Sequence, residues 1–164
     1  MAYIDTPLGP MCAVGSDSAL YLLEFADHRK LDRKLELLKS KTGATLVSGN
    51  SMAIESIKRE LGLYFSGKST AFSTPVVLLG TAFQNRVWQE LRQIPYGKTC
   101  SYAQLAASIA KPTAYRAVAQ ANGQNLLPII IPCHRVINSG GKLGGYSGGL
   151  ERKLRLLKLE KSFT

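Results

Sequence analysis

The chain has 164 residues, of which 45% are hydrophobic and 20% charged, and this balance predicts a soluble globular protein of one domain or two small ones. Its 21 Lys and Arg residues exceed its 11 Asp and Glu residues, which gives a formal net charge of +10. The length excludes a large multidomain assembly, and the charge predicts a polyanionic partner.

The positive charge is concentrated in the C-terminal half of the chain. Residues 1–81 carry nine basic and eight acidic side chains, a net charge of +1, whereas residues 82–164 carry twelve and three, a net charge of +9. This concentration favours nucleic acid as the partner. An anionic membrane surface and charge that serves only solubility are the alternatives.

Cysteine and histidine residues are few and scattered: Cys12, Cys100, Cys133, His28 and His134. A structural zinc site needs closely paired ligands, so no metal site is expected. The odd cysteine count, the lack of a signal peptide and the lack of an apolar run of about 18 residues predict a cytoplasmic protein with free thiols and no membrane contact.

The first 80 residues predict a small α/β domain. Residues 2–4, 12–14 and 19–25 have extended character and predict an antiparallel sheet. Apolar residues recur at helical spacing in residues 31–38 and again in 54–65. An uncharged stretch rich in Ser, Thr, Pro and Gly follows, and it indicates a domain boundary near residue 80.

A pair of short helices is predicted in the second half. Ser101 and Gln104 have the spacing of a capping box, so a helix should begin there and end before Pro112. Thr113 can cap a second helix that runs to about Ala121 and closes at the following Asn-Gly. Two such helices joined by a tight turn predict a helix-turn-helix.

Alanine dominates the second of these helices, at positions 114, 117, 119 and 121. A helix this thin can approach a narrow groove, while Tyr115, Arg116 and Gln120 supply reach. Spacing alone leaves open the alternative of a buried helix hairpin with alanine at its packing seam.

An apolar run at residues 126–132 leads directly into Cys133, His134 and Arg135. We expect the run to be a buried extended segment that carries a thiol at its end. The neighbouring imidazole and guanidinium favour the thiolate, which is the reactive form of cysteine. Adjacent side chains of an extended chain point to opposite sides, so a direct Cys-His pair would need a bridging water or a local turn.

Six of the 15 glycines lie between residues 140 and 149, around Tyr146 and Ser147. Such a loop can bring backbone N–H groups close to a ligand. The glycine spacing matches neither the Walker phosphate loop nor the dinucleotide fingerprint, which argues against a nucleotide cofactor.

The last predicted helix runs from Leu150 to about Lys161. We expect Leu150, Leu154 and Leu157 to form its apolar stripe. Glu160 follows at the edge of the stripe, where a carboxylate would be half buried if it had a partner such as His134.

Several of these segments together resemble the O6-alkylguanine-DNA alkyltransferase family, and the resemblance covers roughly residues 80–161. It rests on Pro132-Cys133-His134-Arg135-Val136, Asn125, Tyr146-Ser147-Gly148-Gly149 and Glu160. The resemblance implies a ribonuclease-H-like α/β domain over residues 1–80 and a winged-helix-like helix-turn-helix domain over residues 81–164. It also implies a monomer that binds duplex DNA through the minor groove and uses no cofactor.

By the same resemblance, Cys133 accepts the alkyl group of O6-alkylguanine, and of O4-alkylthymine, in a single irreversible reaction. Glu160, His134 and a water activate the thiol, and Asn125 braces the active-site turn. The damaged base is flipped out of the duplex and contacts a further set of residues. This implied substrate set is Tyr102, Val136, Tyr146 and Ser147.

The resemblance also implies a set of DNA contacts: Arg116, Tyr102, Thr113, Gln84, Lys111, Ser139 and Tyr115. Arg116 fills the space that the flipped base leaves, and Tyr102 assists the rotation of its phosphate. Tyr115 departs from the family pattern, which has a small residue there, and is expected to add a stacking or phosphate contact. Two further departures, Ala82 and Arg155, touch no reacting atom.

Two other classes of function stay open on the sequence alone. The chain could be a DNA-binding module that senses damage without reacting, although such relatives carry another residue at the position of Cys133. It could also be a cysteine hydrolase, for which repeated turnover of an ester or peptide would be the sign.

Overall fold

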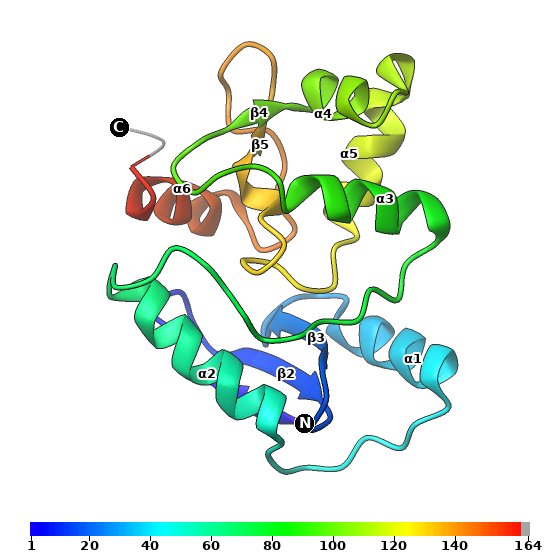
Figure 1. The fold of residues 1–164 in the computed structure, drawn as a ribbon, viewed down its shortest axis with the longest axis vertical. Helices are drawn as coiled ribbons and strands as arrows, with labels where there is room; N and C mark the ends of the chain where they lie inside the picture. The colour runs from blue at the N-terminus through cyan, green and yellow to red at the C-terminus, as the bar shows by residue number, and fades with distance from the viewer. Residues whose placement is uncertain (162–164) are drawn as a thin grey trace. The chain divides into compact units, whose positions relative to one another are not determined.

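The chain forms two compact units, shown in Figure 1, of which the first is Met1–Leu79 and the second begins at Gly80. The structure is a computed structural model that describes residues 1–161. Within these residues, no helix has the length and apolar character needed to cross a membrane.

The first unit is built on a three-stranded antiparallel sheet, as the sequence predicts. Its strands β1 (Ala2–Ile4), β2 (Met11–Gly15) and β3 (Leu20–Phe25) lie in the order β1-β2-β3. The strands are adjacent in the chain and close through short turns, which is typical of a meander.

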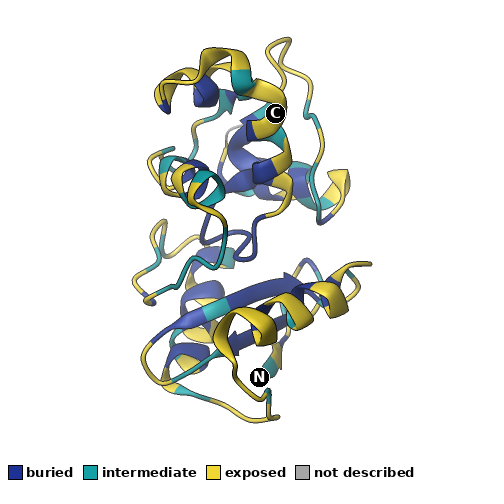
Figure 2. Cartoon of the chain, turned by 90° about the vertical axis from the view of Figure 1, so that its right-hand side faces the viewer, coloured by how far each residue is buried: buried dark blue, intermediate teal, exposed yellow. Residues whose placement is uncertain are grey.

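Helices α1 (Leu31–Thr42) and α2 (Met52–Phe65) complete the first unit. Leu31 and Leu38 of α1 pack with alternate residues of the sheet, among them Val14. Figure 2 shows the buried strands and the exposed outer surfaces of the helices. No group of reactive side chains gathers among the buried residues described in this unit, whose core is mainly aliphatic.

Three helices form the framework of the second unit: α3 (Ala82–Leu91), α4 (Tyr102–Ser108) and α5 (Tyr115–Gly123). The capping box predicted at Ser101 and Gln104 is confirmed at the start of α4, and a second one starts α3. The indole of Trp88 in α3 donates a hydrogen bond to the Ala121 carbonyl of α5 over 2.8 Å, which fixes these two helices to each other.

A short parallel pair of strands joins the helices to the reactive segment. Strand β4 (Cys100–Ser101) pairs with β5 (Val136–Ile137). A single 3-10 turn, η2 (Cys133–Arg135), leads directly into β5, and helix α6 (Leu150–Leu159) packs against that turn. Ser101 thus has two tasks, because it ends β4 and caps α4.

The expectation for α6 is wrong in its register. Leu150 is 53% exposed, and the buried face consists of Lys153, Leu156, Leu157 and Glu160. The helix begins directly after Gly149. Its buried face is rotated away from the leucine stripe because Glu160 binds His134 and Lys153 binds the Val136 carbonyl inside the unit.

Two local expectations near the site are also wrong. A 3-10 turn, η1 (Pro112–Ala114), precedes α5, whose N-cap is Ala114, so Thr113 does not cap it. Residues 126–132 are buried as expected but fold into a turn rather than an extended segment, in which Ile129 has a φ of 76°. Proline on each side and the hydrogen bonds of Asn125 hold this turn.

Candidate active site

Cys133 lies at the start of η2 and is 1% exposed. Its backbone N–H donates to the Ile131 carbonyl over 2.7 Å, so the preceding turn presents the sulfur from a fixed backbone. The other two cysteines differ in their surroundings. Burial raises the pKa of the Cys12 thiol, and burial with the nearby Glu90 carboxylate raises the pKa of Cys100 to about 11.

Two asparagines from the end of α5 hold the reactive turn. The Asn125 side-chain amide donates to Cys133 Sγ over 3.1 Å and to the Ile131 carbonyl over 2.9 Å, and its oxygen accepts from the Leu127 N–H. The Asn122 amide donates to the Cys133 carbonyl over 3.3 Å. A hydrogen bond donated to sulfur favours the thiolate over the thiol. Asn125 therefore bonds the backbone of the turn and favours the thiolate form of Cys133.

A buried carboxylate and imidazole lie behind the cysteine. His134 Nε2 is 2.9 Å from Glu160 Oε1, and both side chains are fully buried. Arg135 holds the same carboxylate from the other side, with its Nε 2.8 Å from Oε2 and its Nη2 3.0 Å from Oε1. Arg135 also donates to the Ile94 carbonyl over 2.6 Å. This two-point contact fixes both the charge and the orientation of Glu160.

The imidazole of His134 is held neutral. Burial lowers its pKa, and Arg135 and Lys153 lower it further, against the opposing effect of Glu160. Because an ionised carboxylate can only accept, Nε2 carries the proton and Nδ1 keeps its lone pair. Nδ1 has no hydrogen-bond partner among residues 1–161. The ring therefore offers a buried base on the side away from Glu160.

Lys153 is the main residue near Cys133 that the sequence did not predict. Its side chain is fully buried, and its Nζ donates to the Val136 carbonyl over 2.6 Å and to the Gly145 carbonyl over 3.1 Å. Burial lowers its pKa to about 8, and the charge of Cys133 opposes that shift. Lys153 therefore connects β5 to the glycine loop through these two carbonyls, and its charge lies near Cys133.

Tyr102 connects α4 to the glycine loop. Its hydroxyl donates to the Gly145 carbonyl over 3.4 Å, the same carbonyl that Lys153 binds. Burial and the negative charges of Cys133 and Cys100 raise the pKa of Tyr102. The phenol is therefore protonated at neutral pH and available as a donor near the thiol. Tyr146 and Ser147, on the same loop, are half-buried.

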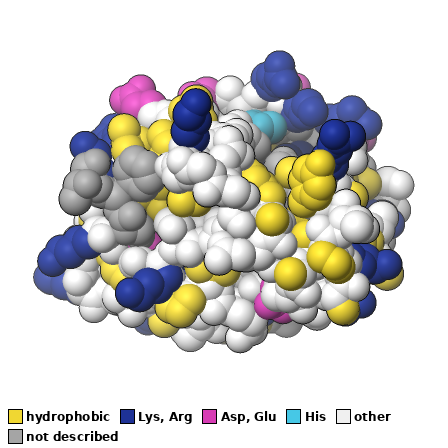
Figure 3. Space-filling view, turned by 90° about the horizontal axis from the view of Figure 1, so that it is seen from above, with side chains coloured by type: hydrophobic (Ala, Val, Ile, Leu, Met, Phe, Trp, Pro, Cys, Tyr) yellow, Lys and Arg dark blue, Asp and Glu magenta, His cyan; other side chains and the backbone are white. Residues whose placement is uncertain are grey.

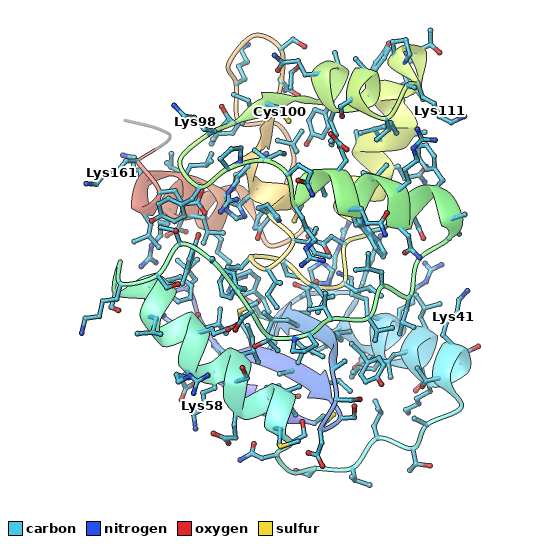
Figure 4. All side chains as sticks on the ribbon, viewed as in Figure 1. Lys41, Lys58, Lys98, Cys100, Lys111 and Lys161 are labelled. Carbon is cyan, nitrogen blue, oxygen red and sulfur yellow. The ribbon has the colours of Figure 1, made fainter. Side chains whose placement is uncertain are left out.

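The surface formed by η1 and the start of α5 is basic and exposed. Lys111, Thr113, Tyr115 and Arg116 all lie on it, and Lys111 extends outward from the unit in Figure 4. The sequence has no acidic residue between Glu90 and Glu151. Figure 3 shows Lys and Arg side chains around the edge of the view, with Asp and Glu side chains at several places between them.

The structure brings some of the predicted site residues together and separates others. Cys133, His134, Asn125 and Glu160 form one buried cluster, with Val136 tied to it through Lys153. Arg116 and Tyr115 lie on α5, and Ser139 lies on an exposed turn after β5. Gln84 is in α3, where its amide completes the capping box and contacts Gln124.

The sequence around the missed residues Asn122 and Lys153 points to other roles than the ones the structure gives them. Asn122 precedes a glycine at the predicted end of a helix, which reads as a C-cap rather than as a ligand of the reactive turn. Lys153 sits within a charged helix, where a lysine is ordinarily solvated. Among the described residues, no group of three or more His, Cys, Asp or Glu side chains could hold a metal ion.

The second unit therefore places a buried cysteine and a buried His-Glu pair in the same unit as the exposed basic residues at the start of α5. Residues 82–162 match the family described as 6-O-methylguanine DNA methyltransferase, DNA binding domain. The methylated-DNA–protein-cysteine methyltransferase of Mycobacterium tuberculosis H37Rv is 46% identical, over 97% of this chain and 90% of that protein. That of Methanosarcina barkeri is 43% identical, over 97% and 95%.

A solved structure gives the same result. The crystal structure of Mycobacterium tuberculosis OGT in complex with DNA is 43% identical and superposes with a TM-score of 0.83, covering 98% of this chain and 92% of that one. Identity at this level over nearly the full length of both chains shows common ancestry as well as a common fold. The chain belongs to the 6-O-methylguanine DNA methyltransferase family.

Proposed function

We propose that this protein repairs DNA by transferring the alkyl group of O6-alkylguanine to Cys133, once per molecule, as a methylated-DNA–protein-cysteine methyltransferase. One observation carries the proposal: Asn125 donates to the sulfur of a cysteine whose neighbour His134 is bound to a buried, ionised Glu160. The basic helix-turn-helix in the same unit supplies the surface for duplex DNA.

The chemistry is a displacement at saturated carbon. The sulfur of Cys133 forms a bond to the alkyl carbon, the bond from that carbon to guanine O6 breaks, and its electron pair stays on the guanine. The thiol proton passes through a water to His134 Nδ1, and the departing guanine, which carries the electron pair, takes up a proton from solvent water at its ring nitrogen. The Tyr102 hydroxyl donates to the departing oxygen. The thioether has no hydrolytic exit, so the protein is consumed.

The substrate base is held by the walls of the site. The carbonyls of Cys133 and Val136 accept from the guanine amino group, and the Ser147 N–H donates to the base beside Tyr146. Lys153 orients the Val136 carbonyl, which it binds in the free protein. The same site accepts O4-alkylthymine, which offers an alkylated oxygen in a similar position. No cofactor takes part in this scheme.

DNA binds through the minor groove, with the damaged base flipped out. Arg116 enters the stack that the base leaves, while Lys111, Thr113, Ser139 and Gln84 contact the backbone, and Tyr115 lies beside Arg116 on the same surface. We assign a ribonuclease-H-like fold to residues 1–80 and a winged-helix-like fold to residues 81–164. The protein acts in the cytoplasm as a monomer.

The proposal is tested with a duplex that contains one O6-methylguanine. Methyl loss from the DNA should stop at one equivalent per protein, and Cys133→Ser should remove it while the protein stays folded. The matched control is Cys100→Ser, in which transfer should persist. Repeated turnover, or transfer by the Cys133→Ser protein, would overturn the proposal.

A further inference from the structure

An aromatic side chain supports the cation at the start of α5. The guanidinium carbon of Arg116 lies 5.8 Å from the centre of the Tyr115 ring. Both residues are exposed, Tyr115 by 45%, and both lie in the first turn of the helix that follows η1. This distance is within the range of a cation–π contact.

The fold makes no other use of the Tyr115 ring. Helix α5 buries Val118, Ala121 and Asn122, whereas the Tyr115 side chain at its first residue is 45% exposed and lies outside the core. Its neighbours Ala114 and Ala117 are small and leave it uncovered. Among residues 1–161, the contact with the Arg116 guanidinium is the one recorded for this ring.

Arg116 itself has no carboxylate to hold it. None of the ion pairs in residues 1–161 includes Arg116, and the chain has no acidic residue between Glu90 and Glu151. An unpaired arginine on the surface samples many rotamers, and each must be given up when the side chain is fixed in a complex. A neighbouring ring face narrows that sampling without neutralising the charge.

We infer that Tyr115 is a positioning residue for Arg116, and that its ring holds the guanidinium in place before duplex DNA arrives. The inference rests on the proposed function, in which Arg116 takes the place of the flipped base. The ring acts at the step where the duplex is opened and has no part in the reaction at Cys133. An exposed cation–π contact is strong enough to change that step by a factor of about two to five.

The prediction separates opening of the duplex from alkyl transfer. Tyr115→Ala should slow single-turnover methyl transfer from an O6-methylguanine duplex by about two- to fivefold. The rate on a single-stranded oligonucleotide with the same lesion should not change, because no duplex has to open. Tyr115→Phe keeps the ring and should restore the duplex rate. Tyr3→Ala removes an exposed tyrosine of the first unit, 58% exposed, and is the matched control.

A double-mutant cycle distinguishes an intramolecular role from a direct contact of the ring with DNA. In the Arg116→Ala background, Tyr115→Ala should have no further effect on the duplex rate. A second readout is available without DNA: the Arg116 side-chain Nε–H signal in NMR spectra of the free protein should lose its ring-current shift in Tyr115→Ala and keep it in Tyr115→Phe.

Three results would overturn the inference. The first is an equal loss of rate on duplex and single strand, which indicates a structural defect. The second is an effect of Tyr115→Ala that persists in the Arg116→Ala background, which indicates a DNA contact of the ring itself. The third is an unchanged duplex rate in Tyr115→Ala while the wild-type protein is active. If the wild-type protein transfers no methyl group, the proposed function fails and the inference fails with it.

Discussion

Glu24 in the first unit and Glu160 in the second are both buried carboxylates with a cationic partner. Glu24 is paired with Lys34 and accepts the Phe25 N–H, and the pair joins β3 to α1. Glu160 is paired with Arg135 but also binds His134, the residue next to the thiol. We infer from this difference that Glu24 stabilises the fold and that Glu160 acts in the reaction, because only Glu160 orients a side chain that can take up a proton.

The difference between Glu160 and Glu24 is tested most directly by removing the charge of each carboxylate in turn. Glu160→Gln should lower the rate of methyl transfer by about 100-fold or more, because it removes the negative charge that stabilises the imidazolium formed when His134 takes up the thiol proton. Glu24→Gln should leave the rate unchanged. Both should lower the free energy of unfolding by about 3 kcal/mol, since each leaves a buried cation without its counter-charge.

Single-turnover rates and denaturant unfolding of both variants are the measurements. Equal loss of activity in the two variants would show that stability, rather than chemistry, accounts for the effect of Glu160. An active Glu160→Gln protein would remove the carboxylate from the mechanism.

The pKa of Lys153 predicts that the rate of methyl transfer depends on pH. Its folded-state pKa of about 8 lies below the ordinary value of 10.5, because burial disfavours the charged form. The cation near Cys133 is therefore present below about pH 8, and it is lost as the pH rises through that value. Lys153→Met should lower the transfer rate by about tenfold at neutral pH through loss of a charge that favours the thiolate.

The pH profile tests this role more specifically than the rate alone. The wild-type rate should stop rising with pH near 8, and this limit should be absent in Lys153→Met. Burying the charge also costs stability below pH 8, so the contribution of Lys153 to the free energy of unfolding should rise between about pH 8 and 10.5. The same profile in both proteins would exclude Lys153 from the electrostatics of the thiol.

The lowered pKa of His134 predicts how the free energy of unfolding changes at acidic pH. Its pKa is below 6.5 because burial disfavours the imidazolium, so the unfolded chain takes up the proton first as the pH falls. The stability from the neutral ring is fully present above about pH 6.5 and is lost progressively below it. NMR titration should find His134 still neutral at pH 6.5, with the proton on Nε2. A ring that is half protonated at that pH would contradict the assignment.

The capping box of α4 has the smallest expected effect. Ser101→Ala removes the acceptor for the Gln104 N–H and should cost about 1 kcal/mol of unfolding free energy. Thr81→Ala, in the second capping box, should cost about as much. Chemical denaturation measures both, and a much larger loss for Ser101 would indicate that its position between β4 and α4 matters beyond the cap.

Local patterns predicted the local structure well. Ser101 and Gln104 indicate the start of α4, and the extended segments near the N-terminus indicate the sheet, because capping and the pairing of consecutive strands depend on neighbours in the sequence. The cluster of Cys133, His134 and Glu160 could be named only through the resemblance, since 26 residues separate His134 from Glu160. Spacing alone gives no means of joining them.

The expectations that were wrong involve charged residues whose burial is decided by distant partners. Leu150 is exposed although it fits the leucine stripe of α6, and Lys153 is buried although it does not. The buried Lys153 ammonium donates hydrogen bonds to the carbonyls of Val136 and Gly145, and neither residue is adjacent to it in the sequence. The turn at Ile129 was missed for a different reason, because it depends on the hydrogen bonds that the nearby Asn125 side chain makes with Ile131 and Leu127.

The most direct test of the account is to find which thiol carries the transferred group. The three cysteines are all free, and only Cys133 accepts a hydrogen bond from Asn125 beside a buried imidazole base. After reaction with a duplex that carries an isotope-labelled O6-methyl group, peptide mapping by mass spectrometry should place the whole label on Cys133. Label on Cys12 or Cys100, or no label on any cysteine, would contradict the account.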